Sequence, residues 1–159
     1  MPERVLETIQ QVAVPATARA HSTLAHVDYE DCHLVDVPKA SDRTAEAWAR
    51  AVLEDAPESL RRSLRSGWRS LGIRLGPVTG AGVLGWPVRR SDPDVVLLGA
   101  TSRLGMQGEL LIERRPQHLL FATLLQFDNP LARAVWVPIA RPHVRVVRYV
   151  LEQARARWE

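Results

Sequence analysis

The chain has 159 residues, of which 46% are apolar and 25% charged, as is typical of one globular domain. This composition excludes disorder along the whole chain, and the single cysteine, Cys32, excludes an intrachain disulfide and a cysteine-based metal site. The net charge is only +3, and the arginines are spread along the chain, which argues against a nucleic-acid partner because such binding needs basic residues clustered on one face.

The N-terminal part is predicted to be an extension, residues 1–23, ahead of one domain over residues 24–159. Glu3 and Glu7 interrupt the first residues, so the pattern is not that of a signal peptide. A short helix is predicted over residues 4–13, ended by Pro15. No window approaches 18 uncharged apolar residues, which predicts no membrane span and, with the lone cysteine, a cytoplasmic protein.

A strand and two helices are predicted next. Residues 27–37 alternate imperfectly between apolar and polar and end at Pro38, which predicts a strand. Apolar residues at helical spacing after Asp42 predict a first helix around Trp48. A second helix is predicted from Pro57 to about Gly72, because Leu60, Leu64, Trp68 and Leu71 form a stripe with arginines around it.

The second half of the chain is predicted to form a sheet followed by a long helix. Short connections imply antiparallel pairing of the predicted strands. A stripe that runs from His143 through Val147 to Ala154 predicts the terminal helix. This segregated order of strand, two helices, several strands and a long C-terminal helix predicts an α+β fold. The predicted strands are 82–90, 93–101, 104–114, 117–127 and 131–137.

The order and several short motifs resemble a known superfamily. The chain is similar to START-like (SRPBCC, polyketide-cyclase-like) helix-grip domains and, more narrowly, to the bacterial group called domain of unknown function 2867. The resemblance implies a curved antiparallel sheet and an apolar cavity between that sheet and the last helix. The motifs that carry it are Asp28-Tyr29-Glu30-Asp31, Ala47-Trp48, Leu84-Gly85-Trp86, Ala132-Arg133-Ala134-Val135-Trp136 and Pro142-His143.

The first functional hypothesis is therefore binding of a small apolar molecule. Relatives in the wider superfamily bind lipids, sterols, polyketides or hormones, and some catalyse cyclisation or dehydration. The narrower group supplies no catalytic motif, so no catalytic residue is carried over. Removal of apolar ligand surface from water would drive binding, and a few polar groups would orient the ligand. The residues predicted to line the cavity are Trp86, Met106, Phe121, Thr123, Trp136, His143 and Val147.

Two alternatives remain open. The first is a small cavity enzyme, a cyclase, dehydratase or hydrolase, in which His143 acts as general base near neutral pH. The second is a protein-interaction module that uses the N-terminal segment and the arginine-rich helical faces. No cofactor is predicted, because the glycine-rich residues 76–82 lack a following Lys-Ser/Thr pair. No metal site is predicted, since His26, Asp28, Asp31 and His33 fit a charged edge strand better.

Overall fold

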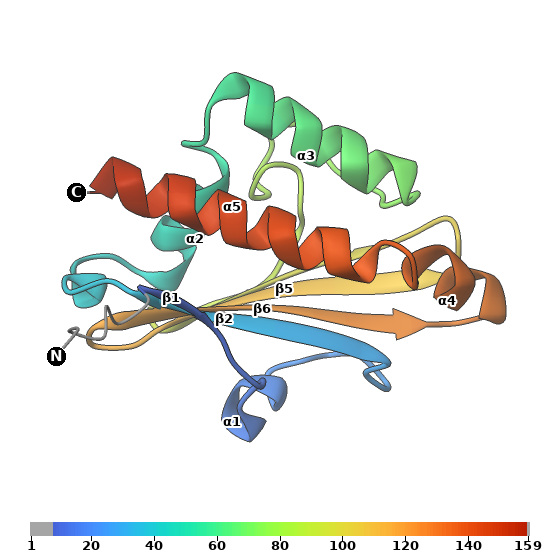
Figure 1. The fold of residues 1–159 in the computed structure, drawn as a ribbon, viewed down its shortest axis with the longest axis horizontal. Helices are drawn as coiled ribbons and strands as arrows, with labels where there is room; N and C mark the ends of the chain where they lie inside the picture. The colour runs from blue at the N-terminus through green and yellow to red at the C-terminus, as the bar shows by residue number, and fades with distance from the viewer. Residues whose placement is uncertain (1–7, 159) are drawn as a thin grey trace, which may run out of the picture.

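A computed structural model describes residues 8–158 and shows an α+β fold built on one curved antiparallel sheet (Figure 1). The strand order is β1-β2-β6-β5-β4-β3, and every neighbouring pair is antiparallel. The predicted fold class is thus confirmed. The strands are β1 (Ile9–Gln11), β2 (Tyr29–Asp36), β3 (Val88–Ser91), β4 (Val95–Thr101), β5 (Met106–Arg114) and β6 (His118–Phe127).

The long C-terminal helix lies across one face of this sheet, here called the inner face (Figure 1). Its apolar side packs on β1 and β2, and α3 lies beyond it, farther from the sheet. Val147, Val150 and Leu151 of this helix are buried, so packing holds in place a helix rich in β-branched residues. The helices are α1 (Ala16–Arg19), α2 (Ala45–Leu53), α3 (Glu58–Ser70), α4 (Pro130–Trp136) and α5 (Ala140–Trp158), with a 3-10 turn at Ala40–Asp42.

The first described segment is a strand, which corrects the helix predicted over residues 4–13. Residues 9–11 form β1 and pair with the free edge of β2, with Ile9 opposite Val35. Ile9 is buried in the same apolar cluster as α5, so its burial and the ladder hydrogen bonds replace the short helix. Residues 4–7 of that prediction lie outside the described residues.

Residues 131–137, predicted as a strand, instead form most of the helix α4. Asn129 caps it, because its side-chain oxygen accepts a hydrogen bond of 2.8 Å from the backbone N–H of Ala132. Pro130 occupies the first turn, where its missing N–H costs nothing. Asn129 and Pro130, which lie between the predicted strands 117–127 and 131–137, therefore begin a helix instead of forming a turn.

The strand predicted over 82–90 is also shorter, and begins only at Val88. Before it, Val83 and Trp86 bond to each other across a tight turn whose middle residues, Leu84 and Gly85, have positive φ angles of 47° and 92°. This turn places Trp86 in the core against Trp68 of α3, with ring centroids 5.6 Å apart.

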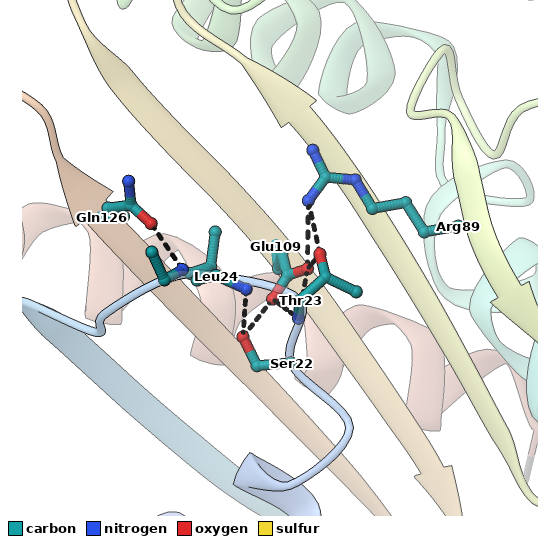
Figure 2. Close-up of polar contacts among 7 residues, drawn as sticks. Ser22, Thr23, Leu24, Arg89, Glu109 and Gln126 are labelled. Atoms are coloured by element: carbon teal, nitrogen blue, oxygen red, sulfur yellow. Dashed lines mark hydrogen bonds and ion pairs between the residues drawn. The ribbon is translucent and has the colours of Figure 1, made fainter.

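The segment around α1 lies against the opposite, outer face of the sheet (Figure 1). Val14 and Ala18 pack there against apolar residues of β2, β4, β5 and β6. Polar contacts hold the same segment to Glu109 of β5, which is fully buried (Figure 2). Within residues 8–158, no helix is both long enough and apolar enough to cross a bilayer.

Candidate functional site

An apolar groove lies between α3 and α5 and is here called the α3–α5 groove. Its volume is about 500 Å³, within the range of small-molecule sites. One wall is the apolar stripe of α3, and the other is formed by α5 and the turn before it. Val146 and Tyr149 of α5 are 44% and 51% exposed there, which is unusual for apolar residues on a packed helix. The groove is lined mainly by Leu60, Leu64, Trp68, Leu71, Trp136, Ile139, His143, Val146 and Tyr149.

A second, smaller space lies directly beneath α5. Its volume is about 40 Å³, enough for one or a few small atoms but not for a ligand by itself. Phe121 of β6 and Val147 of α5 are among the side chains that fill this region. The space between the sheet and α5 is therefore far smaller than the cavity predicted there, and the larger α3–α5 groove has no sheet residue in its lining. Both spaces are lined by Leu64, Trp68, His143 and Val146, so they adjoin each other.

His143 stands where the groove meets a buried polar cluster on β2 and β6. Its Nε2 lies 3.2 Å from Oδ2 of Asp31 and 3.2 Å from the hydroxyl of Thr123. The Tyr29 hydroxyl donates a hydrogen bond of 2.6 Å to the same oxygen of Asp31. Antiparallel pairing sets Asp31 directly opposite Thr123, and the first turn of α5 carries His143 over both. We call Tyr29, Asp31, Thr123 and His143 the Asp31 cluster.

The surroundings of the Asp31 cluster favour a carboxylate next to a protonated phenol. Burial alone would raise the pKa of Asp31, but the hydrogen bond and charge of His143 and the hydrogen bond from Tyr29 outweigh it, so the pKa is lowered. Burial and the bond to Asp31 raise the pKa of Tyr29, which keeps its hydroxyl protonated. Asp31 therefore accepts hydrogen bonds, and Tyr29 donates one.

Several buried polar atoms around this cluster have no hydrogen-bond partner. These are Oδ1 of Asp31, Nε1 of Trp136 and both ring nitrogens of His33. Asp31 is 6% exposed, Trp136 3% and His33 1%. The Trp136 ring packs against His143 and Tyr29, with centroid distances of 5.1 Å and 5.0 Å. Native proteins leave few such groups unsatisfied, so the buried region beneath His143 is a candidate place for a small polar group.

Five of the seven residues predicted to line a cavity lie at this site. Phe121 and Val147 line the small pocket, Trp136 lines the α3–α5 groove, His143 lines both, and Thr123 contacts His143. The other two line neither space, because Trp86 packs behind Trp68, and Met106 lies in a cluster with Leu125 and Trp136. Contact of any of these residues with a ligand stays a prediction.

Sequence reasoning missed Tyr29 and Asp31, the two polar residues that contact each other beneath His143. A signal was present, because Tyr29, Asp31 and His33 alternate with Cys32 and Leu34, so they share one face of the strand with the buried Val35. Trp68, predicted only as part of the apolar stripe of the second helix, also lines both apolar spaces. Polar residues on the core-facing side of a strand are the pattern to look for.

Reactive cysteine chemistry is not favoured at this sheet. Burial, followed by the nearby charge of Asp31, raises the pKa of Cys32 to about 12, which keeps the thiol protonated. Cys32 points to the outer face and packs among apolar residues there. Across residues 8–158, no three His, Cys, Asp or Glu side chains are grouped as metal ligands.

Comparisons of the chain with protein-family models, with curated proteins and with solved structures found no match. The α3–α5 groove and the Asp31 cluster are therefore the features that bear on function.

Proposed function

We propose that this protein, as a START-like helix-grip domain of the cytoplasm, binds a small apolar ligand in the α3–α5 groove. The observation that carries the proposal is the groove itself, about 500 Å³ of mainly apolar space that ends at the buried Asp31 cluster. The order of elements and the α5 helix across the sheet support the family. The lone buried cysteine supports a reducing compartment.

The driving force would be burial of apolar surface that the free protein exposes to water. Val146 and Tyr149 are about half exposed, and Trp68 and Trp136 offer large aromatic surfaces beside them. A ligand that buries about 200 Å² of apolar surface there gains about 5 kcal/mol, before the entropic cost of association. The polar atoms beside His143 would then orient one end of the ligand.

The test is binding of phenylnaphthylamine, an uncharged apolar dye that fluoresces when it leaves water. Val146→Arg places a long charged side chain in the groove and should weaken dye binding by about tenfold or more. Val137→Arg is the matched control, because Val137 is 66% exposed on the turn after α4 and lines neither apolar space. Equal binding by both variants, or no binding by the unmodified protein, would overturn the proposal.

A second candidate is a small cavity enzyme, a cyclase, dehydratase or hydrolase, with His143 as general base. The contact between Asp31 and Nε2 of His143 favours it, because a carboxylate commonly orients a catalytic imidazole and stabilises its protonated form. Hydrolysis of nitrophenyl acetate, an activated aromatic ester, is a simple assay. His143→Ala should abolish turnover and leave the melting temperature nearly unchanged. A large fall in melting temperature would instead make His143 a structural residue.

A further inference from the structure

A second pocket on α3 is dominated by arginines and is separate from the α3–α5 groove. It lies between α3 and the loop that follows this helix, and its volume is about 450 Å³. The helix contributes four arginines and Glu58 to the lining, and the loop contributes the apolar side chains of Val78 and Leu84. Four cations and one anion give the lining a net charge of +3. We call this space, lined by Arg61, Arg62, Arg65 and Arg69, the α3 basic pocket.

Three of these arginines form one ridge of the helix. Arg61, Arg65 and Arg69 follow each other at intervals of four residues, which places them on the same side of α3. At a rise of 1.5 Å per residue, the ridge extends about 12 Å along the helix axis. Within residues 8–158, no carboxylate forms an ion pair with any of the three, and the one carboxylate in the lining, Glu58, contacts Arg62 at 2.9 Å.

Two arginines on other helices are paired with glutamates one turn away. Arg50 contacts Glu46 and Glu54, and Arg148 contacts Glu152. Opposite charges four residues apart stabilise a helix, whereas like charges at this spacing destabilise it. The unpaired ridge therefore lowers the stability of α3, and a bound anion would replace this repulsion with attraction.

The loop holds the middle arginine of the ridge in place. Nη1 of Arg65 donates a hydrogen bond of 2.9 Å to the backbone oxygen of Leu84, and Nη2 donates one of 3.3 Å to that of Gly76. A guanidinium has five N–H groups, so donors remain for a ligand. Burial, followed by the charge of Arg69, lowers the pKa of Arg65. The two cations are therefore close enough to repel each other, and an anion between them would relieve that repulsion.

The charge of the pocket matches a ligand with two phosphoryl groups. A phosphoryl group carries a charge of about −1.5 to −2 and three acceptor oxygens, and a guanidinium binds such oxygens in pairs. Two linked phosphoryl groups thus supply about three to four negative charges, close to the net charge of the lining, whereas one phosphate supplies about half of that. Val78 is 43% exposed and offers apolar surface to an uncharged part of the ligand.

We propose that the α3 basic pocket binds a soluble small molecule that carries two linked phosphoryl groups, with Arg61, Arg65 and Arg69 as hydrogen-bond donors. A concave space of this size suits a small molecule better than a flat membrane surface. The side chain of Glu58 is 76% exposed, so water screens its repulsion of the ligand. The site goes beyond the proposed function, because this pocket and the α3–α5 groove share no lining residue.

The direct test is isothermal titration calorimetry of the unmodified full chain with three anions, in metal-free buffer of low salt at neutral pH. The anions are pyrophosphate, inorganic phosphate and citrate. Pyrophosphate should bind about tenfold tighter than phosphate, because its second phosphoryl group reaches further arginines. It should also bind about fivefold tighter than citrate, whose negative charge is carried by carboxylates alone. Pyrophosphate that binds no tighter than phosphate or citrate, or does not bind, would overturn the proposal.

Variants of the ridge locate the site. Arg61→Gln and Arg69→Gln each remove one cation but keep similar helix propensity, so each should weaken pyrophosphate binding by about tenfold at a nearly unchanged melting temperature. Arg141→Gln is the matched control, because Arg141 is an exposed arginine of α5 that does not line the pocket, and its effect should stay below about twofold. An equal loss in all three variants would mean unspecific attraction to the protein's charge and would contradict the proposal.

Glu58→Gln tests the same pocket in the opposite direction. It removes the negative charge of the lining and frees Arg62, so pyrophosphate should bind about twofold to threefold tighter. Weaker binding by this variant at an unchanged melting temperature would contradict an anion in this pocket.

Two further measurements separate the proposal from its alternatives. Vesicles of phosphatidylglycerol test a membrane surface, and sedimentation with them that needs Arg61 and Arg69, without binding of pyrophosphate, would overturn the soluble ligand. Val146→Arg, which blocks the α3–α5 groove, should bind pyrophosphate as the unmodified protein does. If Val146→Arg abolishes pyrophosphate binding, the anion lies in the α3–α5 groove and its assignment to the α3 basic pocket is wrong.

Discussion

Two buried carboxylates lie on opposite faces of the same sheet and differ in how well they are satisfied. Glu109, on the outer face, accepts from the hydroxyl of Ser22 at 2.5 Å, from the hydroxyl of Thr23 at 2.7 Å and from Arg89 at 3.1 Å (Figure 2). Asp31, on the inner face, accepts through Oδ2 from Tyr29 and His143, while its Oδ1 has no partner. Both side chains are almost fully buried.

The difference separates a structural polar site from a candidate binding site. Within residues 8–158, the partners of Glu109 belong to the segment that packs on the outer face or to β3, the edge strand beyond β4, so this cluster holds parts of the fold together. Around Asp31, by contrast, several buried polar atoms lack a partner, and His143, which contacts Asp31, lines the α3–α5 groove. A folded protein retains such imperfectly paired groups where something else can use them.

The largest expected effect is on the outer face. Glu109→Gln removes the charge that Arg89 pairs with and turns an acceptor into a donor among donors, so it should lower the free energy of unfolding by about 3 kcal/mol. Urea unfolding measures the loss, and hydrogen exchange should show faster opening around Ser22. Glu58→Gln is the control, because its pair with Arg62 is exposed at 76% and 75%. A loss below about 1 kcal/mol would mean that the outer cluster is not structural.

A smaller loss is expected from the other side of the same ion pair. Arg89→Met keeps most of the apolar stem and leaves Ser22 and Thr23 still bonded to Glu109. Since Arg89 is 26% exposed at its side chain, water can replace part of the lost contact, and the loss should be about 1 to 2 kcal/mol. Thermal unfolding of the two variants side by side checks the order. If Arg89→Met loses more stability than Glu109→Gln, Arg89 and not Glu109 is the main structural residue of this ion pair.

On the inner face, Asp31→Asn should cost about 1 kcal/mol or less, because the amide oxygen can still accept from Tyr29 and the second amide group replaces an atom that had no partner. Urea unfolding against Glu109→Gln is the direct comparison. If the two substitutions are equally destabilising, Asp31 is as structural as Glu109 and the contrast between the two faces is lost.

The smallest effect concerns His33 and depends on pH. Burial lowers the pKa of His33, so the folded protein binds this proton less readily than the unfolded chain does, and stability falls as pH drops below about 6.5. His33→Leu removes the two unpartnered nitrogens and this proton-linked loss. The variant should therefore lose about 0.5 to 1 kcal/mol less than the unmodified protein between about pH 6.5 and pH 5. Urea unfolding at several pH values measures this difference. If the unfolding free energies of the variant and of the unmodified protein fall equally over this pH range, His33 is not a buried neutral residue.

The sheet centre and the last helix could be predicted from the sequence because their patterns are local. The strands predicted over 104–114 and 117–127 match β5 and β6 closely, because the length of each strand and the turns at its ends depend on residues close together in sequence. The stripe of Val147, Val150 and Leu151 likewise predicts the buried side of α5. His143, at the start of that stripe, was identified for the same reason.

Two elements and the partners of His143 could not be predicted. Residues 9–11 are too short for any periodic pattern, and only the free edge of β2 makes them a strand. Residues 130–136 carry apolar residues that suit either structure, and the cap from Asn129 decided for a helix. Asp31 reaches His143 only because β2 pairs with β6 in one register and α5 then crosses above that point. No spacing within a single segment contains this information.

The amino-acid sequence alone determined the α+β class, the strands β2, β4, β5 and β6 and the amphipathic terminal helix, because periodicity and turn residues act over a few neighbouring positions. The tertiary structure alone decided that the apolar space opens mainly between α3 and α5, and that Asp31 and Trp136 leave polar atoms unpaired beside His143. Those features arise where elements far apart in sequence pack together, and the fit between their side chains exists only after the chain has folded.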